Sequence, residues 1–241
     1  MTRTRAQPAR DTQEAPMDFD LSGKRVAFLV ANEGVEQEEL VSPWDAVKRA
    51  GGMPELLAPS TGVVQAMKHL DKGDTFTVDH AISAVPANDY AAVVLPGGVA
   101  NADQLRTDID AIDFVREIFA ASKPAAAICH GAWTLVDAGL VAGRTLTSSP
   151  SLEMDIRNAG GRWVDTEVEI DDASNVLVTG RAPHDLPAFD RALVEVFGTA
   201  TSAASKRYST RQVTDEAIDE AGMDSFPASD PPASNGGIAA R

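Results

Sequence analysis

Short apolar runs alternate with longer amphipathic stretches along most of this chain. The first apolar run, residues 24–31 (KRVAFLVA), is rich in strand-forming residues, and helical periodicity follows over residues 37–50. Further short apolar runs, each closed by Gly, Pro or Ser, predict strands at MPELLAP, AAVVLPGG, PAAAICHG, RTLTS and NVLVTGR. Amphipathic helices are predicted over residues 109–122, 132–140, 151–160 and 185–198.

This alternation predicts an α/β fold. Strands that alternate with amphipathic helices form βαβ units, which give a mostly parallel sheet with helices on both faces. One stretch breaks the pattern: in TEVEIDDASNVLVTG, Val168 and Ile170 alternate with acids before a turn and a returning strand. That stretch predicts a β-hairpin added to the sheet or its edge.

The periodic pattern covers one domain, residues 23–198. Residues 1–22 are polar, contain Pro8 and Pro16 and show no periodicity, so we expect a disordered N-terminal tail. Residues 199–241 are rich in Ser and Ala, then acidic, and end in Pro, Ser and Gly. We expect a largely disordered C-terminal extension there, in which AIDEAGM is the stretch that could form a short helix or dock on a neighbour.

The composition limits the partners and the compartment. With 21 basic and 36 acidic residues, the net charge of -15 argues against nucleic-acid or anionic-membrane partners. No apolar run approaches the roughly 20 residues of a membrane span. The N-terminus has no apolar core of a secretory signal. A single cysteine excludes an internal disulfide, so we expect a cytoplasmic protein.

That single cysteine, Cys129, stands in PAAAICHGAW, between a predicted strand and a predicted helix. Most free cysteines are simply small buried hydrophobes. A side chain on a sharp strand-to-helix turn is instead lifted out of the sheet, and such a turn needs small neighbours. The flanking small residues are Ala126, Ala127, Gly131 and Ala132. The pattern therefore favours a nucleophile elbow.

The elbow position has electrostatic consequences. The free N–H groups of the following helix favour a thiolate, so we predict that the thiol pKa of Cys129 lies below its ordinary value of about 8.5. Ligands bind at the carboxyl ends of parallel strands, where Gly98 also follows a strand. The backbone N–H groups of His130 and Gly98 are the candidates to stabilise an oxyanion.

Several segments resemble one known family. AAVVLPGG, KPAAAICHGAWTLVDAGLVAGRTLTS and NAGGRWVDTEVEIDD followed by VLVTGRAPHDLPAF are similar, in order and spacing, to the ThiJ/PfpI superfamily and its PfpI-like intracellular cysteine peptidase branch. The resemblance spans about residues 23–198. It implies a flavodoxin-like three-layer α/β/α sandwich with a class I glutamine amidotransferase-like core, and a homodimer or higher homo-oligomer.

The resemblance also implies roles for individual residues. Cys129 would be the nucleophile, and Glu36 would hold a proton and hydrogen-bond the sulfur. From the residues alone, Glu36 is one of several solvated acids at a helix start, and only the family register selects it over Glu33, Glu38 and Glu39. His130 would be the base. Asp103, the nearest acid after the PGG loop, would orient that base across a subunit interface.

Two classes of function remain open. The first is a cysteine-dependent hydrolase or lyase acting on a small carbonyl or peptide substrate, which covers peptidase, glyoxalase and deglycase activities. The second is a stress-response redox sensor or holdase without efficient catalysis. A true glutamine amidotransferase is disfavoured because no His-x-Glu lies downstream of the cysteine. We expect no cofactor and no metal, since the spacing of His69 and His80 fits no ligand pattern.

Overall fold

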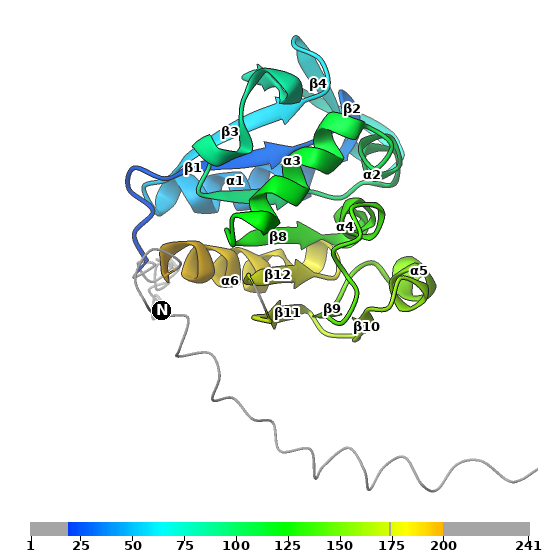
Figure 1. The fold of residues 1–241 in the computed structure, drawn as a ribbon. Coiled ribbons are helices and arrows are strands. Elements are labelled where there is room, and N and C mark those ends of the chain that lie inside the picture. Colours follow the sequence, from blue (N-terminus) through cyan, green and yellow to red (C-terminus); the bar gives the residue numbers. More distant parts are fainter. Residues whose placement is uncertain (1–18, 174, 200–241) are drawn as a thin grey trace, which may run out of the picture. The chain divides into compact units, whose positions relative to one another are not determined.

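A seven-stranded sheet forms the centre of the computed structural model, which describes residues 19–173 and 175–199 (Figure 1). In sheet order the strands are β11 (Val168–Asp171), β12 (Leu177–Gly180), β8 (Ala125–Ile128), β7 (Ala92–Leu95), β1 (Arg25–Leu29), β3 (Met53–Ala58) and β6 (His80–Ala81). Every neighbouring pair is parallel except β11 and β12, which are antiparallel. The predicted α/β fold with a mostly parallel sheet and an edge hairpin is confirmed.

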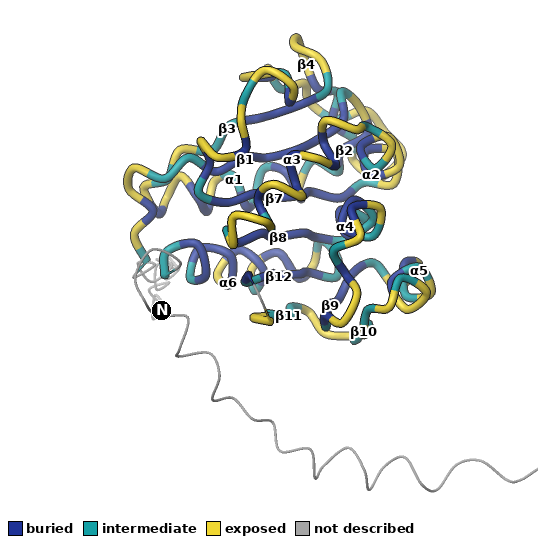
Figure 2. The backbone as a smooth tube through the Cα atoms, in the orientation of Figure 1, coloured by how far each residue is buried: buried dark blue, intermediate teal, exposed yellow. Residues whose placement is uncertain are grey.

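Helices cover both faces of this sheet and complete three layers (Figure 1). One face packs against α1 (Gln37–Arg49) and α6 (Leu186–Thr199), and the other against α3 (Ile109–Ala120) and α4 (Ala132–Asp137). Strand β1 shows how the sequence builds both cores. Phe28 joins the core under α1 and α6, whereas Leu29 joins the core under α3 and α4, because successive strand side chains point to opposite faces. The central strands β7, β8 and β12 are therefore buried along their whole length and are dark blue in Figure 2.

Shorter elements surround this framework. A second sheet, in the order β2-β4-β5, consists of β2 (Glu33–Glu36), β4 (Val63–Lys68) and β5 (Asp71–Thr77). The other short elements are β9 (Thr145–Leu146), β10 (Arg162–Trp163), α2 (Val99–Leu105), α5 (Glu153–Asn158) and the 3-10 turns η1 (Ile82–Ala84), η2 (Ala87–Asp89), η3 (Cys129–Gly131), η4 (Pro150–Leu152) and η5 (Pro183–Asp185). Sequence reasoning missed the second sheet because β5 (DKGDTFT) is mostly exposed and lacks an apolar run.

The folded part begins earlier than predicted. Leu21 is fully buried, and its backbone N–H donates to the carbonyl of Ala50 over 2.8 Å. Phe19 packs against the same core. The prediction of a tail through residue 22 is therefore wrong for residues 19–22, where one leucine among polar residues shows no periodicity. The rest of both predicted tails lies outside the described residues. No helix within residues 19–173 and 175–199 has the length and apolarity to cross a membrane.

Candidate active site

Cys129 occupies a strained elbow between β8 and α4. Its φ of 56° lies in the left-handed region, which residues other than glycine seldom adopt. The turn is also crowded: a Cβ on Gly131 would lie 3.0 Å from the carbonyl carbon of Leu95 and closer still to its oxygen. The absence of a side chain at Gly131 is thus a steric requirement of this turn.

Glu39, on α1, is the carboxyl group next to the thiol. Its side chain is fully buried, and neither oxygen has a well-formed hydrogen bond within the described structure; the groups that face it are the Cys129 thiol and the Gly97 N–H. Burial is the main cause that raises the pKa of Glu39 to about 7. Gly97 permits the close approach, since a Cβ there would lie 2.9 Å from the Cβ of Cys129 and would run into the Glu39 carboxyl.

The prediction that Glu36 contacts the sulfur is wrong, and Glu39 takes that place. Glu36 ends β2, and its carboxylate accepts from the backbone N–H of His69 over 3.1 Å. The helical spacing of buried residues in the sequence pointed to Glu39, but the match to the family motif selected Glu36 instead. Glu39 shares the buried face of α1 with Pro43, Ala46 and Val47, at helical spacing.

The charge state of the thiol also differs from the prediction. Burial first, and then the neighbouring charge of Glu39, raise the pKa of Cys129, whereas the backbone N–H groups of His130 and Gly98 that approach the sulfur lower it. The net direction is upward, so the predicted low pKa is wrong. Two acids in contact in a buried site cannot easily both ionise, and they share one proton above about pH 7.

His130 lies against the sulfur on the pocket side. Its Nδ1 is 3.2 Å from Sγ of Cys129, and its Nε2 is 3.0 Å from Oγ of Ser151, which the sequence gave no reason to select. Burial lowers the pKa of His130, so the ring is neutral at pH 7. Asp103 lies on α2 with an exposed side chain and pairs with Arg106 over 2.8 Å. Within one chain the structure does not bring Asp103 to His130.

A pocket of about 460 Å³ opens onto these groups, and we call it the cysteine pocket. It is lined by Gly34, Glu36, Glu39, Met67, His69, Leu70, Gly98, Val99, Ala100, Cys129, His130 and Pro183. Backbone, small residues and apolar side chains make up most of this lining. Glu39 and His130 lie at the sulfur, whereas Glu36 and His69 pair with each other elsewhere in the lining. A few polar groups in a mostly apolar pocket suit a site that fixes the orientation of a small molecule.

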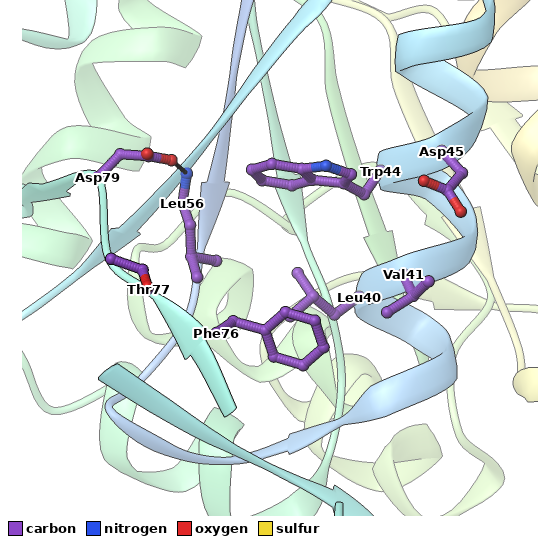
Figure 3. A pocket seen from close by; sticks show the side chains of 8 residues that line it. All are labelled: Leu40, Val41, Trp44, Asp45, Leu56, Phe76, Thr77 and Asp79. Atoms are coloured by element: carbon purple, nitrogen blue, oxygen red, sulfur yellow. Dashed lines mark hydrogen bonds between the residues drawn. The ribbon is translucent and has the colours of Figure 1, made fainter. Parts of the chain in front are cut away.

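A second pocket, of about 300 Å³, lies against helix α1, which also carries Glu39 (Figure 3). We call it the tryptophan pocket. It is lined by Leu40, Val41, Trp44, Asp45, Leu56, Phe76, Thr77 and Asp79. The Trp44 ring packs edge-on against Phe28 with centroids 5.1 Å apart, and Asp79 accepts from the backbone N–H of Leu56 over 2.7 Å. This lining includes neither cysteine nor histidine, so the candidate active site is the cysteine pocket.

The two histidines considered for a metal site lie beside carboxylates in separate places. His69 lies 4.0 Å from Glu36, and His80 lies 3.7 Å from Glu55. Among the residues that the structure describes, no three His, Cys, Asp or Glu side chains gather as a metal would require. The chemistry available at Cys129 is therefore that of a thiol, a carboxyl group, an imidazole and two backbone N–H groups.

Comparisons with known proteins find relatives over most of the described chain. The profile of the DJ-1/PfpI family matches residues 24–196. Protein/nucleic acid deglycase 2 of Escherichia coli (strain K12) is 36% identical over 176 residues, which are 73% of this chain and 98% of that protein. General stress protein 18 of Bacillus subtilis (strain 168) is 36% identical over 169 residues, covering 70% of this chain and 95% of that protein. The crystal structure of Drosophila melanogaster DJ-1beta is similar with a TM-score of 0.65 at 26% identity, over 73% of this chain and 90% of that one.

Proposed function

Because this chain belongs to the DJ-1/PfpI family, as a cysteine enzyme of the PfpI type, we propose that it acts on α-oxoaldehydes and on the adducts they form with amines. The observation that carries this proposal is the buried contact between Cys129 and Glu39 beneath a small pocket. Relatives from Escherichia coli and Pyrococcus horikoshii are named deglycases. A pocket of about 460 Å³ suits a small carbonyl compound and needs no extended peptide.

Glu39 serves as the base for the thiol. With a pKa of about 7, its carboxylate is available at neutral pH, and it takes the proton from Sγ as sulfur attacks the aldehyde carbon. The developing oxyanion is stabilised by the N–H groups of Gly98 and His130, which already approach the sulfur. Glu39 then returns the proton to that oxygen, giving a hemithioacetal.

The remaining steps need no reactant other than water. The hydrogen on the former aldehyde carbon moves as a proton to the neighbouring carbonyl carbon through an enediol, with Glu39 as the carrier. This produces a 2-hydroxyacyl thioester on Cys129. Water hydrolyses the thioester, releases the 2-hydroxy acid and restores the thiol. Oxidation of one carbon is balanced by reduction of the next, so no external oxidant or reductant takes part.

The test is turnover of methylglyoxal, measured as lactate formed, for the wild type and for Cys129→Ala. We expect lactate from the wild type and none above background from the variant, because the thioester cannot form. The methylglyoxal adduct of N-acetylarginine tests the deglycase activity in the same way. In this hemiaminal the C–N bond breaks first, the amine leaves with the proton of the hemiaminal hydroxyl group, and the aldehyde so formed takes the sulfur as above. An exposed control, Ser83→Ala on η1, should match the wild type.

The same preparations separate the alternatives. Bacillus subtilis YraA, 36% identical over 168 residues, has a name that proposes a cysteine protease, so a fluorogenic peptide panel is run in parallel. Peptide cleavage without lactate would replace the proposal with a peptidase. Protection of a heat-aggregating client without any turnover would support the stress-response role that the name of General stress protein 18 suggests.

We also propose that the protein acts in the cytoplasm and associates with copies of itself. The single cysteine among 241 residues supports a reducing compartment. Self-association rests on the family resemblance. Light scattering of the purified chain measures the second proposal, and a monomer at working concentrations would contradict it.

A further inference from the structure

The His130 ring is held from several sides. Its Nδ1 lies 3.2 Å from the Cys129 sulfur, and its Nε2 lies 3.0 Å from the hydroxyl oxygen of Ser151. The edge of the ring packs against Trp133 with centroids 5.6 Å apart. Trp133 is fixed in turn, because its indole N–H donates to the carboxylate of Asp155 over 2.9 Å. The imidazole therefore has one orientation, with a different polar partner at each nitrogen.

Ser151 is placed by the backbone that carries the nucleophile. It lies in η4, and the backbone N–H of the preceding Ser149 donates to the carbonyl of Cys129 over 3.2 Å. The hydroxyl groups of Ser149 and Ser151 lie 3.0 Å apart. This backbone hydrogen bond joins the η4 turn to the cysteine elbow, and the pair of hydroxyl groups ends at Nε2 of His130.

The proton on a neutral imidazole can lie on either nitrogen. Around neutral pH the thiol and Glu39 together carry up to one negative charge, and that charge favours an N–H pointing at the sulfur. With the proton on Nδ1, the lone pair of Nε2 needs a donor. Ser151 is the one partner that the described structure gives to Nε2, and a hydroxyl group can donate.

We propose that Ser151 is a positioning residue that donates its hydroxyl hydrogen to Nε2 and so holds His130 in the Nδ1–H tautomer. His130 then presents a neutral N–H donor to the sulfur and to the oxyanion that forms beside it, and Glu39 handles the proton. This inference rests on the proposed function. It gives His130 a different role from the base that the family resemblance implies, and it replaces an Asp103 from another subunit with a serine of the same chain.

The first experiment reads the tautomer directly. The full chain is labelled with ¹⁵N-histidine, and the His130 signals are assigned with a His130→Gln variant. Long-range ¹⁵N–¹H spectra at pH 7.5 should show Nδ1 protonated in the wild type and in Ser151→Thr. In Ser151→Ala the population should move toward the Nε2–H form that free imidazole side chains favour. An Nε2–H tautomer in the wild type would overturn the proposal.

The second experiment measures the functional consequence. Losing one neutral hydrogen bond to the ring should lower kcat by roughly fivefold to tenfold in Ser151→Ala, with little change in KM, and Ser151→Thr should restore it. The rate of Cys129 alkylation by iodoacetamide should fall by a similar factor. Ser83→Ala is the control for loss of an exposed serine hydroxyl.

The outcomes separate this inference from the proposed function. Tautomer and alkylation rate need no substrate turnover, so they test Ser151 even if methylglyoxal is not a substrate. An unchanged tautomer and alkylation rate in Ser151→Ala would overturn the role of Ser151. A large loss of kcat in Asp103→Asn with none in Ser151→Ala would do the same and would return the orienting role to the acid.

Discussion

Helix α1 contributes to two pockets with opposite characters. In the cysteine pocket it places the buried carboxyl of Glu39, without a well-formed hydrogen bond in the described structure, against a nucleophile with φ of 56°. In the tryptophan pocket it places Leu40 and the half-buried Trp44 against other apolar side chains. Strain and poorly matched polar groups persist where chemistry requires them, whereas apolar contacts stabilise the fold. One helix thus separates a reactive region from a packing region.

The largest expected effect comes from Glu39→Gln. This variant removes the base in the cysteine pocket, and turnover of methylglyoxal should fall by roughly a hundredfold or more. In the wild type, kcat/KM should rise as pH increases through about 7, since the carboxylate form is the active one, and the variant should lack this inflection. The measurement is lactate formation from pH 5 to 9.

Asp45→Asn is the matched control, because it removes a carboxylate of α1 from the tryptophan pocket. Its turnover should stay within about twofold of the wild type, as expected for an exposed substitution. Equal losses of turnover in Glu39→Gln and Asp45→Asn would mean that the tryptophan pocket contributes to turnover as much as the cysteine pocket does.

The next effect is the pH dependence of stability. The pKa of Glu39 rises from 4.5 to about 7 on folding, so the folded state binds more protons than the unfolded state between these values. The free energy of unfolding should therefore fall as pH rises from about 4.5 to 7, by roughly 3 kcal/mol from this group. Urea titrations across this range should show a smaller decline in Glu39→Gln. If the free energy of unfolding changed equally with pH in the wild type and in Glu39→Gln, ionisation of Glu39 would not destabilise the folded state.

The smallest effect concerns the tryptophan pocket. Trp44→Ala removes a half-buried ring that packs on Phe28, and should lower the free energy of unfolding by roughly 2 to 3 kcal/mol. Turnover per folded molecule should be little changed. Urea denaturation followed by circular dichroism, with exposed Val63→Ala as the control, gives the comparison. If turnover were lost while the stability was retained, the tryptophan pocket would belong to the active site.

Strong local patterns explain what the sequence could predict. Apolar strands such as VAFLV and AAAI are buried on both faces, so their runs revealed the parallel sheet. Cys129 was recognisable because a lone nucleophile followed a strand among small residues. The place of Gly98 and His130 beside the sulfur followed from the rule that sites form at the carboxyl ends of strands.

Other site residues depend on geometry that no local pattern encodes. Ser151 reaches His130 only because η4 turns back toward the elbow, and one serine in SSPS looks like any other. Glu39 could have been found by giving the helical period of α1 priority over the family register. Leu21 was missed because a single buried residue has no period.

The order of the strands also has a kinetic consequence. Cys129 follows β8, Gly97 and Gly98 follow β7, and Glu39 lies beyond β1 and β2, so the groups around the sulfur meet only when β8, β7 and β1 have paired in parallel. Such pairings join distant parts of the chain and form slowly, after local helices. A refolding chain should therefore regain its helical circular dichroism before its thiol acquires its native reactivity, and the nascent protein carries an ordinary cysteine until the sheet closes.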